Sequence, residues 1–278
     1  MPVGDNGCMK NRILTTCTAF LLLTTSGASA APEPDWVEAM RTVHSEFNGK
    51  AGYVAQFGDS ITYSMAFWNP MSWSDPSVYL SGKDGLPRKP GGKRWRDVIL
   101  GTQDKGPEHG NYSGWTSTQV RRAAEKIIPE RKPETAIILA GSNDIRGGRV
   151  PEDYRANLEA IVDACLSIHC IPILNTLPPF RGRDAAVDEA NRIIRDIARR
   201  KRLPLADYHA ACLARRPGTS WDGTLISKDG VHPSAVQPDD YGEQNLKNSG
   251  YALRNWVNFL VYRELYFKVL TDRGGQTK

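Results

Sequence analysis

Apolar segments and helical patterns alternate along the chain after residue 50. Four mainly apolar segments have the length of buried strands: Gly52–Phe57, Thr135–Ala140, Ile171–Thr176 and Leu203–Asp207. Apolar positions at helical spacing, with capping residues nearby, predict helices at Thr116–Ile128, Pro151–Ile168, Asp184–Lys201 and Ser249–Leu270. This alternation predicts an α/β fold with a mostly parallel central sheet.

Two stretches interrupt the alternation. Residues 64–110, here called the aromatic insertion, are rich in Trp, Gly, Pro and charge, and Pro233–Asn248 is polar. A long segment with little periodicity is typical of a binding loop or a lid. Neither stretch has the composition of a separate domain, so residues 31–278 are predicted to form a single domain.

The first thirty residues have the pattern of a secretory signal peptide. Lys10 and Arg12 precede the apolar stretch Ile13–Leu23, and Ala28-Ser29-Ala30 provides small residues for cleavage. We therefore expect a secreted or periplasmic protein, cleaved near Ala30. No later segment offers about 18 consecutive apolar residues, so no membrane anchor is expected.

Charge and cysteine content narrow the set of partners. The chain has 36 basic and 31 acidic residues, and its densest basic run, Arg199–Arg202, ends a predicted helix, where cations complement the helix dipole. A nucleic-acid partner is therefore not expected. Cys165, Cys170 and Cys212 do not have the spacing of a metal site, so no metal and no cofactor are predicted. The oligomeric state and any cysteine pairing stay open.

Two short motifs hold residues suited to nucleophilic chemistry. Gly58-Asp59-Ser60 follows the first predicted strand directly, at the carboxyl end where open α/β sheets hold their reacting groups. Taken alone, this motif also fits a capped tight turn. Asp229-Gly230-Val231-His232 lies near the other end of the chain and supplies a base with a carboxylate three residues before it. Together the motifs offer a nucleophile, its base and the group that orients the base.

Four segments in a fixed order strengthen this interpretation: Ala55–Thr62, Tyr112–Ser117, Ile138–Asp144 and Asp229–Ser234. They resemble the four sequence blocks of the SGNH/GDSL hydrolase family. The resemblance covers nearly all of residues 31–278 and implies a three-layer α/β/α sandwich of the flavodoxin-like type. The Gly-x-Ser-x-Gly motif of the α/β-hydrolases does not occur in this chain.

The resemblance also implies a role for individual residues. Ser60 would be the nucleophile, His232 its general base, and Asp229 the acceptor that holds the imidazole in one tautomer. The amides of Ser60 and Gly114 and the side chain of Asn143 would form the oxyanion hole. At the glycine position, Gly110 is an alternative to Gly114, and a simple turn glycine is another.

The substrate is the property that the sequence determines least. We predict that Trp68, Trp73 and Trp115 bind substrate, because indole rings stack on sugars, and that the protein removes acetyl groups from a carbohydrate. The alternative for each ring is packing of the insertion against the body. Alternative functions are a general short-chain or aryl esterase or lipase, and a noncatalytic carbohydrate-binding protein. The expected partner is a small-molecule or polysaccharide ester.

The family pattern is altered after the last motif. A glycine and an apolar helix commonly follow the final His-Pro pair within a few residues, whereas here Gly250 arrives only after Ala235–Ser249. The added residues are expected to form a loop beside His232 and to affect access of substrate.

Overall fold

The computed structural model describes residues 34–271. The predicted signal peptide, residues 1–30, lies outside them. In the described part of the chain, no helix is both long enough and apolar enough to cross a membrane.

A parallel sheet forms the centre of the fold. Its strands are β1 Lys50–Gly58, β2 Pro133–Leu139, β3 Ile171–Asn175 and β4 Leu205–Ala206, hydrogen-bonded in the order β1-β2-β3-β4. Every residue of β2 and β3 is buried, as expected for parallel strands covered on both faces. The predicted strands and the α/β fold class are confirmed.

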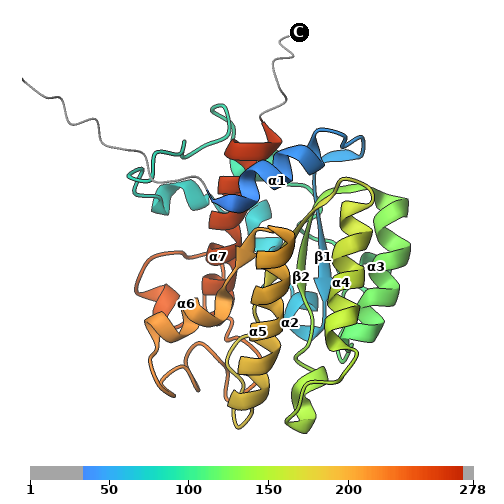
Figure 1. Ribbon diagram of the computed structural model, residues 1–278. Helices are drawn as coiled ribbons and strands as arrows, with labels where there is room; N and C mark the ends of the chain where they lie inside the picture. The colour runs from blue at the N-terminus through green and yellow to red at the C-terminus, as the bar shows by residue number, and fades with distance from the viewer. Residues whose placement is uncertain (1–33, 272–278) are drawn as a thin grey trace, which may run out of the picture. The chain divides into compact units, whose positions relative to one another are not determined.

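Helices cover both faces of the sheet (Figure 1). The crossover helices α3 Ser117–Arg131, α4 Tyr154–Leu166 and α5 Asp184–Lys201 join successive parallel strands, so right-handed crossovers place them on one face. The other face is covered by α1 Asp35–His44 and by α7 Gly250–Leu265, which continues as the π-helix η7 Tyr266–Leu270. The short helix α6 Tyr208–Arg215 follows β4. The four predicted helices are present, whereas α1 and α6 were not predicted.

The outer edge of β1 pairs with the aromatic insertion. The amide of Leu100 donates to Gly52 and its carbonyl accepts from Val54, at 2.8 and 3.1 Å. Farther along β1, Gly58 donates its amide to the carbonyl of Gly110, the last residue of the insertion, at 3.1 Å, and its carbonyl accepts from the amide of Tyr112, just after the insertion, at 3.2 Å. These bonds satisfy backbone groups that an edge strand would otherwise leave exposed.

Rings of the aromatic insertion form part of the hydrophobic core. Phe67, Trp68 and Trp95 are each at most 1% exposed. The Trp95 ring makes edge contacts with four rings of α7 and η7, at centroid distances of 5.1 Å to Phe259, 6.3 Å to Tyr262, 5.3 Å to Tyr266 and 5.7 Å to Phe267. The insertion is therefore anchored to the body by aromatic packing.

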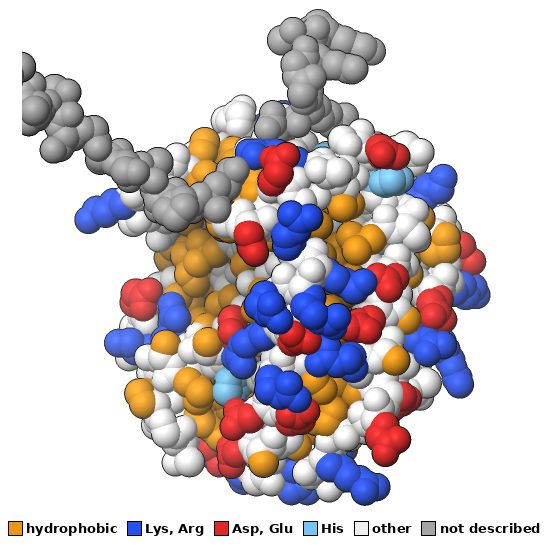
Figure 2. Space-filling model, viewed as in Figure 1, with side chains coloured by type: hydrophobic (Ala, Val, Ile, Leu, Met, Phe, Trp, Pro, Cys, Tyr) orange, Lys and Arg blue, Asp and Glu red, His pale blue; other side chains and the backbone are white. Residues whose placement is uncertain are grey.

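The basic run at the end of α5 is paired with carboxylates. Arg199 and Arg200 both contact Asp196, and Lys201 contacts Asp163 on α4. Figure 2 shows basic and acidic side chains interspersed over this face. These ion pairs show that the basic run is part of the charged surface of α5.

Cys165, Cys170 and Cys212 are all buried, and none of them is in a disulfide. Helix α4 ends at Leu166, between the first two. Burial raises the pKa of Cys212 to about 12, which keeps its thiol protonated at neutral pH.

Candidate active site

Ser60 lies where β1 passes into α2, the single turn Ser60–Tyr63. Asp59 caps this turn, because its Oδ1 accepts the Ile61 amide at 3.0 Å. A Cβ at Gly58 would lie 2.3 Å from both the Leu139 carbonyl oxygen and the Thr62 hydroxyl. Only glycine fits at position 58, which explains why glycine begins the Gly-Asp-Ser motif.

Two hydrogen bonds join Ser60, His232 and Asp229. The Ser60 hydroxyl lies 2.9 Å from Nε2 of His232, and Nδ1 of the same ring lies 2.6 Å from Oδ2 of Asp229. An ionised carboxylate can only accept, so Nδ1 carries the ring proton and Nε2 is free to accept from the serine. The structure thus brings together the predicted nucleophile, base and orienting acid, which are far apart in the sequence.

The loop around Asp229 keeps this carboxylate charged. Burial acts to raise its pKa, but hydrogen bonds from the Val231 amide, the ring and amide of His232 and the Ser227 hydroxyl outweigh it. They hold the pKa of Asp229 well below the ordinary value. A permanent negative charge at this point stabilises the imidazolium that forms when His232 takes a proton.

Arg181 holds the backbone of the same loop. Its amide donates to the Gly230 carbonyl at 2.9 Å, and its guanidinium donates to the Lys228 carbonyl at 3.1 Å and to both carboxylate oxygens of Asp222. Gly230 has a φ of +77°, and a Cβ there would lie 2.7 Å from Cβ of Arg181. No motif in the sequence pointed to Arg181, because its partners are at least 41 residues away.

Two backbone amides of the predicted oxyanion hole are available to a ligand. Within residues 34–271, the amides of Ser60 and Gly114 have no hydrogen-bond acceptor. Gly114 has a φ of +81°, and no atom lies within 4 Å of the position of its absent Cβ. The alternative, Gly110, donates its amide to Pro107 and would clash with the Phe57 ring if it had a Cβ. The geometry therefore favours Gly114 over Gly110.

The Asn143 side chain is held from both sides. Its Nδ2 donates to the Trp115 carbonyl at 2.9 Å, and its Oδ1 accepts from Nε of Arg146 at 2.9 Å. An amide nitrogen has two hydrogens, so one N–H remains for a ligand. The next residue, Asp144, accepts from the amide and the hydroxyl of Ser117 at 2.8 and 2.5 Å, which links this loop to the start of α3.

Two basic side chains, one buried and one partly buried, hold the end of α2. Nζ of Lys105 donates to the carbonyls of Thr62 and Phe67, at 2.7 and 3.1 Å. Arg254 of α7 donates to the Ile61 carbonyl at 2.8 Å and stacks 3.5 Å from the Phe67 ring centroid. Burial lowers the pKa of Arg254 to about 10 and that of Lys105 well below its usual value. Neither residue was predicted from the sequence, and both fix the turn that carries Ser60.

The three predicted substrate-binding tryptophans have different environments. The prediction for Trp68 is wrong, because this part of the insertion folds into the core. The Trp68 side chain is 0% exposed and packs edge-on against Tyr262, and the residue has a backbone φ of +60°. Trp73 is 48% exposed, and its Nε1 donates to Asp239 of the Pro233–Asn248 loop at 3.0 Å. Trp115 is partly buried and lies beside Tyr112, 6.1 Å between ring centroids.

The fold and the site together define a class of protein. A parallel α/β sheet holds a Ser-His-Asp chain at the carboxyl end of β1, and within residues 34–271 the Ser60 amide has no acceptor. This is the arrangement of a serine hydrolase.

Comparison with known proteins identifies the family. Residues 57–236 match the model of the GDSL-like lipase/acylhydrolase family. The chain therefore belongs to this family and is a carboxylic ester hydrolase. No curated protein matches this chain.

Solved structures show the same fold at low sequence identity. A lipase/acylhydrolase from Enterococcus faecalis is 22% identical with a TM-score of 0.52, the match covering 78% of this chain and 96% of that one. A lipolytic protein of the G-D-S-L family from Desulfitobacterium hafniense DCB-2 is 18% identical with a TM-score of 0.51, over 76% and 99%. The psychrotrophic esterase EstA from Pseudoalteromonas sp. is 15% identical with a TM-score of 0.51, over 78% and 99%.

Proposed function

We propose that the protein is a serine esterase that removes acetyl groups from a carbohydrate through an acyl-enzyme intermediate. The observation that carries the proposal is the hydrogen-bonded chain from Ser60 through His232 to Asp229. The amides of Ser60 and Gly114, which have no acceptor among the described residues, support it. His232 Nε2 takes the Ser60 proton as Oγ attacks the ester carbonyl. The same ring then protonates the departing alcohol, and a water activated by His232 hydrolyses the acyl-enzyme to release acetate and regenerate Ser60.

The negative charge that develops during attack needs donors already in place. The amides of Ser60 and Gly114 and the second Nδ2 hydrogen of Asn143 are the candidates for the oxyanion hole. Fixed donors of this kind stabilise the tetrahedral intermediate without reorganisation during the reaction.

A short acyl group fits the surroundings of Ser60 better than a fatty acyl chain. A lipase lid exposes an amphipathic face to lipid. The helices of the aromatic insertion, η1 Asn69–Ser72, η2 Pro76–Tyr79, η3 Trp95–Asp97 and η4 Pro107–His109, have at most four residues each. Three of its rings, Phe67, Trp68 and Trp95, are buried in the core. Exposed Tyr63 and Tyr112 rings near Ser60 suit a sugar, which presents both apolar ring faces and hydroxyl groups.

The test compares acetate release from acetylated xylo-oligosaccharides with hydrolysis of ethyl acetate and of p-nitrophenyl octanoate, using Ser60→Ala as the control. We expect the highest kcat/KM on the acetylated sugar and no turnover by Ser60→Ala. Activity on the small ester alone would instead indicate the general short-chain esterase. Turnover of no ester, with sugar binding unchanged in Ser60→Ala, would indicate a noncatalytic binding protein.

Export is part of the same proposal. It is supported by the charge, apolar stretch and small-residue site of the first thirty residues, which lie outside the described residues. Mass spectrometry of protein recovered outside the cytoplasm should give a chain that begins near Ala31. A chain that retains Lys10 and Arg12 would contradict export by cleavage.

A further inference from the structure

Three aromatic rings form a continuous surface next to Ser60. The centroids of Tyr63 and Tyr112 are 5.3 Å apart, and those of Tyr112 and Trp115 are 6.1 Å apart, each pair tilted by 54°. We call Tyr63, Tyr112 and Trp115 the aromatic platform. Only Trp115 was singled out from the sequence.

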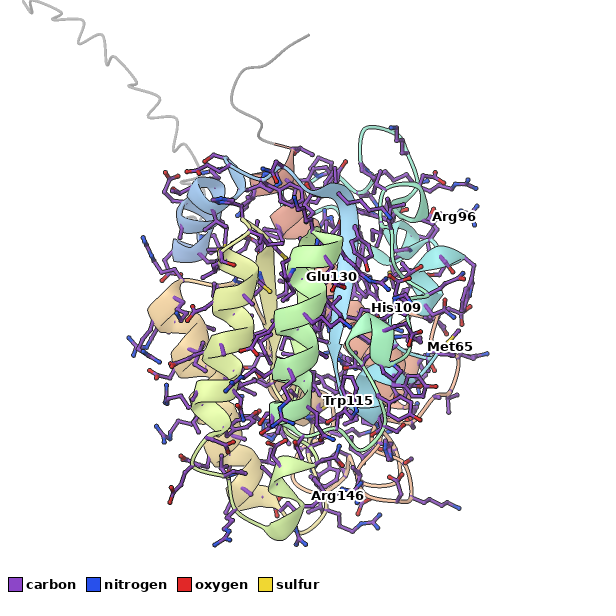
Figure 3. The ribbon with its side chains drawn as sticks, turned by 90° about the vertical axis from the view of Figure 1, so that its right-hand side faces the viewer. Met65, Arg96, His109, Trp115, Glu130 and Arg146 are labelled. Atoms are coloured by element: carbon purple, nitrogen blue, oxygen red, sulfur yellow. The ribbon has the colours of Figure 1, made fainter. Side chains whose placement is uncertain are left out.

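The backbone places the aromatic platform at the reacting centre. Tyr63 lies three residues after Ser60 on the single turn α2, and residues at this spacing are neighbours on a helix surface. Tyr112 and Trp115 flank Gly114, and the Trp115 carbonyl accepts from Asn143. In the view of Figure 3, Trp115 and Arg146 lie at the same end of the molecule.

The polar atoms of these rings have no partner among the residues that the structure describes. In the described part of the chain, neither the hydroxyl groups of Tyr63 and Tyr112 nor Nε1 of Trp115 makes a hydrogen bond. Tyr63 is 36% and Tyr112 41% exposed, so both rings present part of their surface to solvent. Clustered exposed rings are typical of a binding surface. The three unpaired donors on these rings can each bind a hydroxyl group of a ligand.

We propose that the aromatic platform binds the pyranose ring that carries the acetyl group, an inference that rests on the proposed function. The apolar face of a sugar ring covers aromatic carbon, while its hydroxyls accept from the phenol and indole donors. A hydrocarbon acyl chain would cover the rings but leave all three donors without partners. The chemistry of the platform therefore favours a sugar over a fatty chain.

The test compares Tyr112→Leu with a matched control, Tyr79→Leu. Tyr79, a residue of the aromatic insertion, is 39% exposed, a fraction similar to that of Tyr112. Its ring packs instead against Tyr241 of the Pro233–Asn248 loop and Trp256 of α7. The readout is the ratio of kcat/KM for an acetylated xylo-oligosaccharide to kcat/KM for ethyl acetate, which has no ring. We expect Tyr112→Leu to lower this ratio roughly tenfold, mainly through KM. Tyr112→Phe should lower it less, and Tyr79→Leu should leave it unchanged.

Each other outcome counts against the platform. Equal ratios of the two kcat/KM values in Tyr112→Leu and Tyr79→Leu would show that the aromatic platform does not contact the sugar. A fall confined to octanoate esters would assign the rings to the acyl chain. If the wild-type protein hydrolyses ethyl acetate but no acetylated sugar, the proposed function itself fails, and this result is distinct from loss of the ratio in the variant alone.

A separate observation concerns the direction in which Asn143 points. The side-chain amide can serve an oxyanion only if its nitrogen, not its oxygen, faces Ser60. Nε of Arg146 donates to Oδ1 of Asn143 at 2.9 Å, while the Arg183 side chain donates to the Arg146 carbonyl at 2.7 Å. A donor at Oδ1 excludes the flipped amide, and its positive charge polarises the remaining N–H.

The geometry points to Arg146 as a positioning residue for Asn143, an inference that also rests on the proposed function. The matched control is Arg149, an exposed arginine of the same loop that has no partner among residues 34–271. We expect Arg146→Gln to lower kcat on ethyl acetate about tenfold with little change in KM, less than loss of Asn143 itself would. Arg146→Lys should restore part of the rate, and Arg149→Gln should leave it unchanged.

A boronic acid that forms a tetrahedral adduct on Ser60 provides the second readout. Its affinity should fall in Arg146→Gln in proportion to kcat, because both depend on the oxyanion hole. Equal effects of the Arg146 and Arg149 variants, or a change in KM alone, would contradict the positioning role.

Discussion

The loops at the carboxyl ends of the strands and the aromatic insertion differ in how their side chains are used. At the strand ends, His232 and Asp229 are partly exposed and bonded to each other and to Ser60. In the insertion, Phe67, Trp68 and Trp95 are buried, and Lys105 donates a hydrogen bond to the Thr62 carbonyl of α2. The first region holds the groups suited to chemistry and the second holds the scaffold that positions them. Variants in the two regions should therefore affect different measurements.

Asp229→Asn should give the largest effect on activity. An amide can donate to Nδ1 and so favours the wrong tautomer, and in serine hydrolases this change costs about 10⁴-fold in kcat. Steady-state kinetics on ethyl acetate would measure the loss, and the melting temperature should change little because the side chain is about half exposed. A large fall in melting temperature with nearly normal kcat would reverse the assignment of the two regions.

Trp95→Ala should have the largest effect on stability. The ring is buried against four others of α7 and η7, and truncation of a buried Trp costs about 3–5 kcal/mol. Urea denaturation would measure this loss, while kcat well below the melting temperature should stay near the wild-type value. The exposed Trp73 is the control, and Trp73→Ala should change the free energy of unfolding by no more than about 0.5 kcal/mol.

Asn143→Ala should lower kcat by about 100- to 1000-fold, the usual cost of one oxyanion donor. A second variant, Asn143→Asp, keeps the shape of the side chain but can donate neither to the Trp115 carbonyl nor to an oxyanion. We expect both variants to be slow. A fast Asn143→Asp would show that this side chain does not donate to the oxyanion.

Asp84→Asn should have a small, pH-dependent effect. Arg263 of α7 donates to Asp84 of the insertion and lowers the pKa of this carboxyl. A lowered folded-state pKa gives stability that is present above the ordinary value of about 3.9 and is lost as the pH falls through the folded value. At pH 7 the variant should melt about 2–4 °C below the wild type. The difference should vanish in acid, and a gap that persists below pH 2 would contradict the ion pair as its source.

The strands and the reacting residues were predictable from local signals. Apolar segments gave the four strands, and Gly58-Asp59-Ser60 and Asp229–His232 hold groups whose chemistry depends on close spacing. Lys105 and Arg254 could not be found in this way, because their contacts to Thr62 and Ile61 span 43 and 193 residues. Nothing in a single sequence reports such pairings.

Exposure of the aromatic residues was the main error. Trp68 and Trp73 are five residues apart in the same insertion, yet one is buried and the other 48% exposed. Composition cannot distinguish them, since burial depends on how the insertion meets α7. Tyr63 and Tyr112 were overlooked for the same reason: they meet only because Tyr112 pairs with the end of β1.

The central claim is that Ser60, activated by His232, is the residue that becomes acylated. Treatment with diethyl p-nitrophenyl phosphate, followed by mass spectrometry of the peptides, tests it most directly. We expect one phosphoryl adduct per chain, on Ser60, with p-nitrophenol release and loss of esterase activity in step, and no adduct in Ser60→Ala or His232→Ala. An adduct on another residue, or ester hydrolysis that persists in Ser60→Ala, would contradict the account.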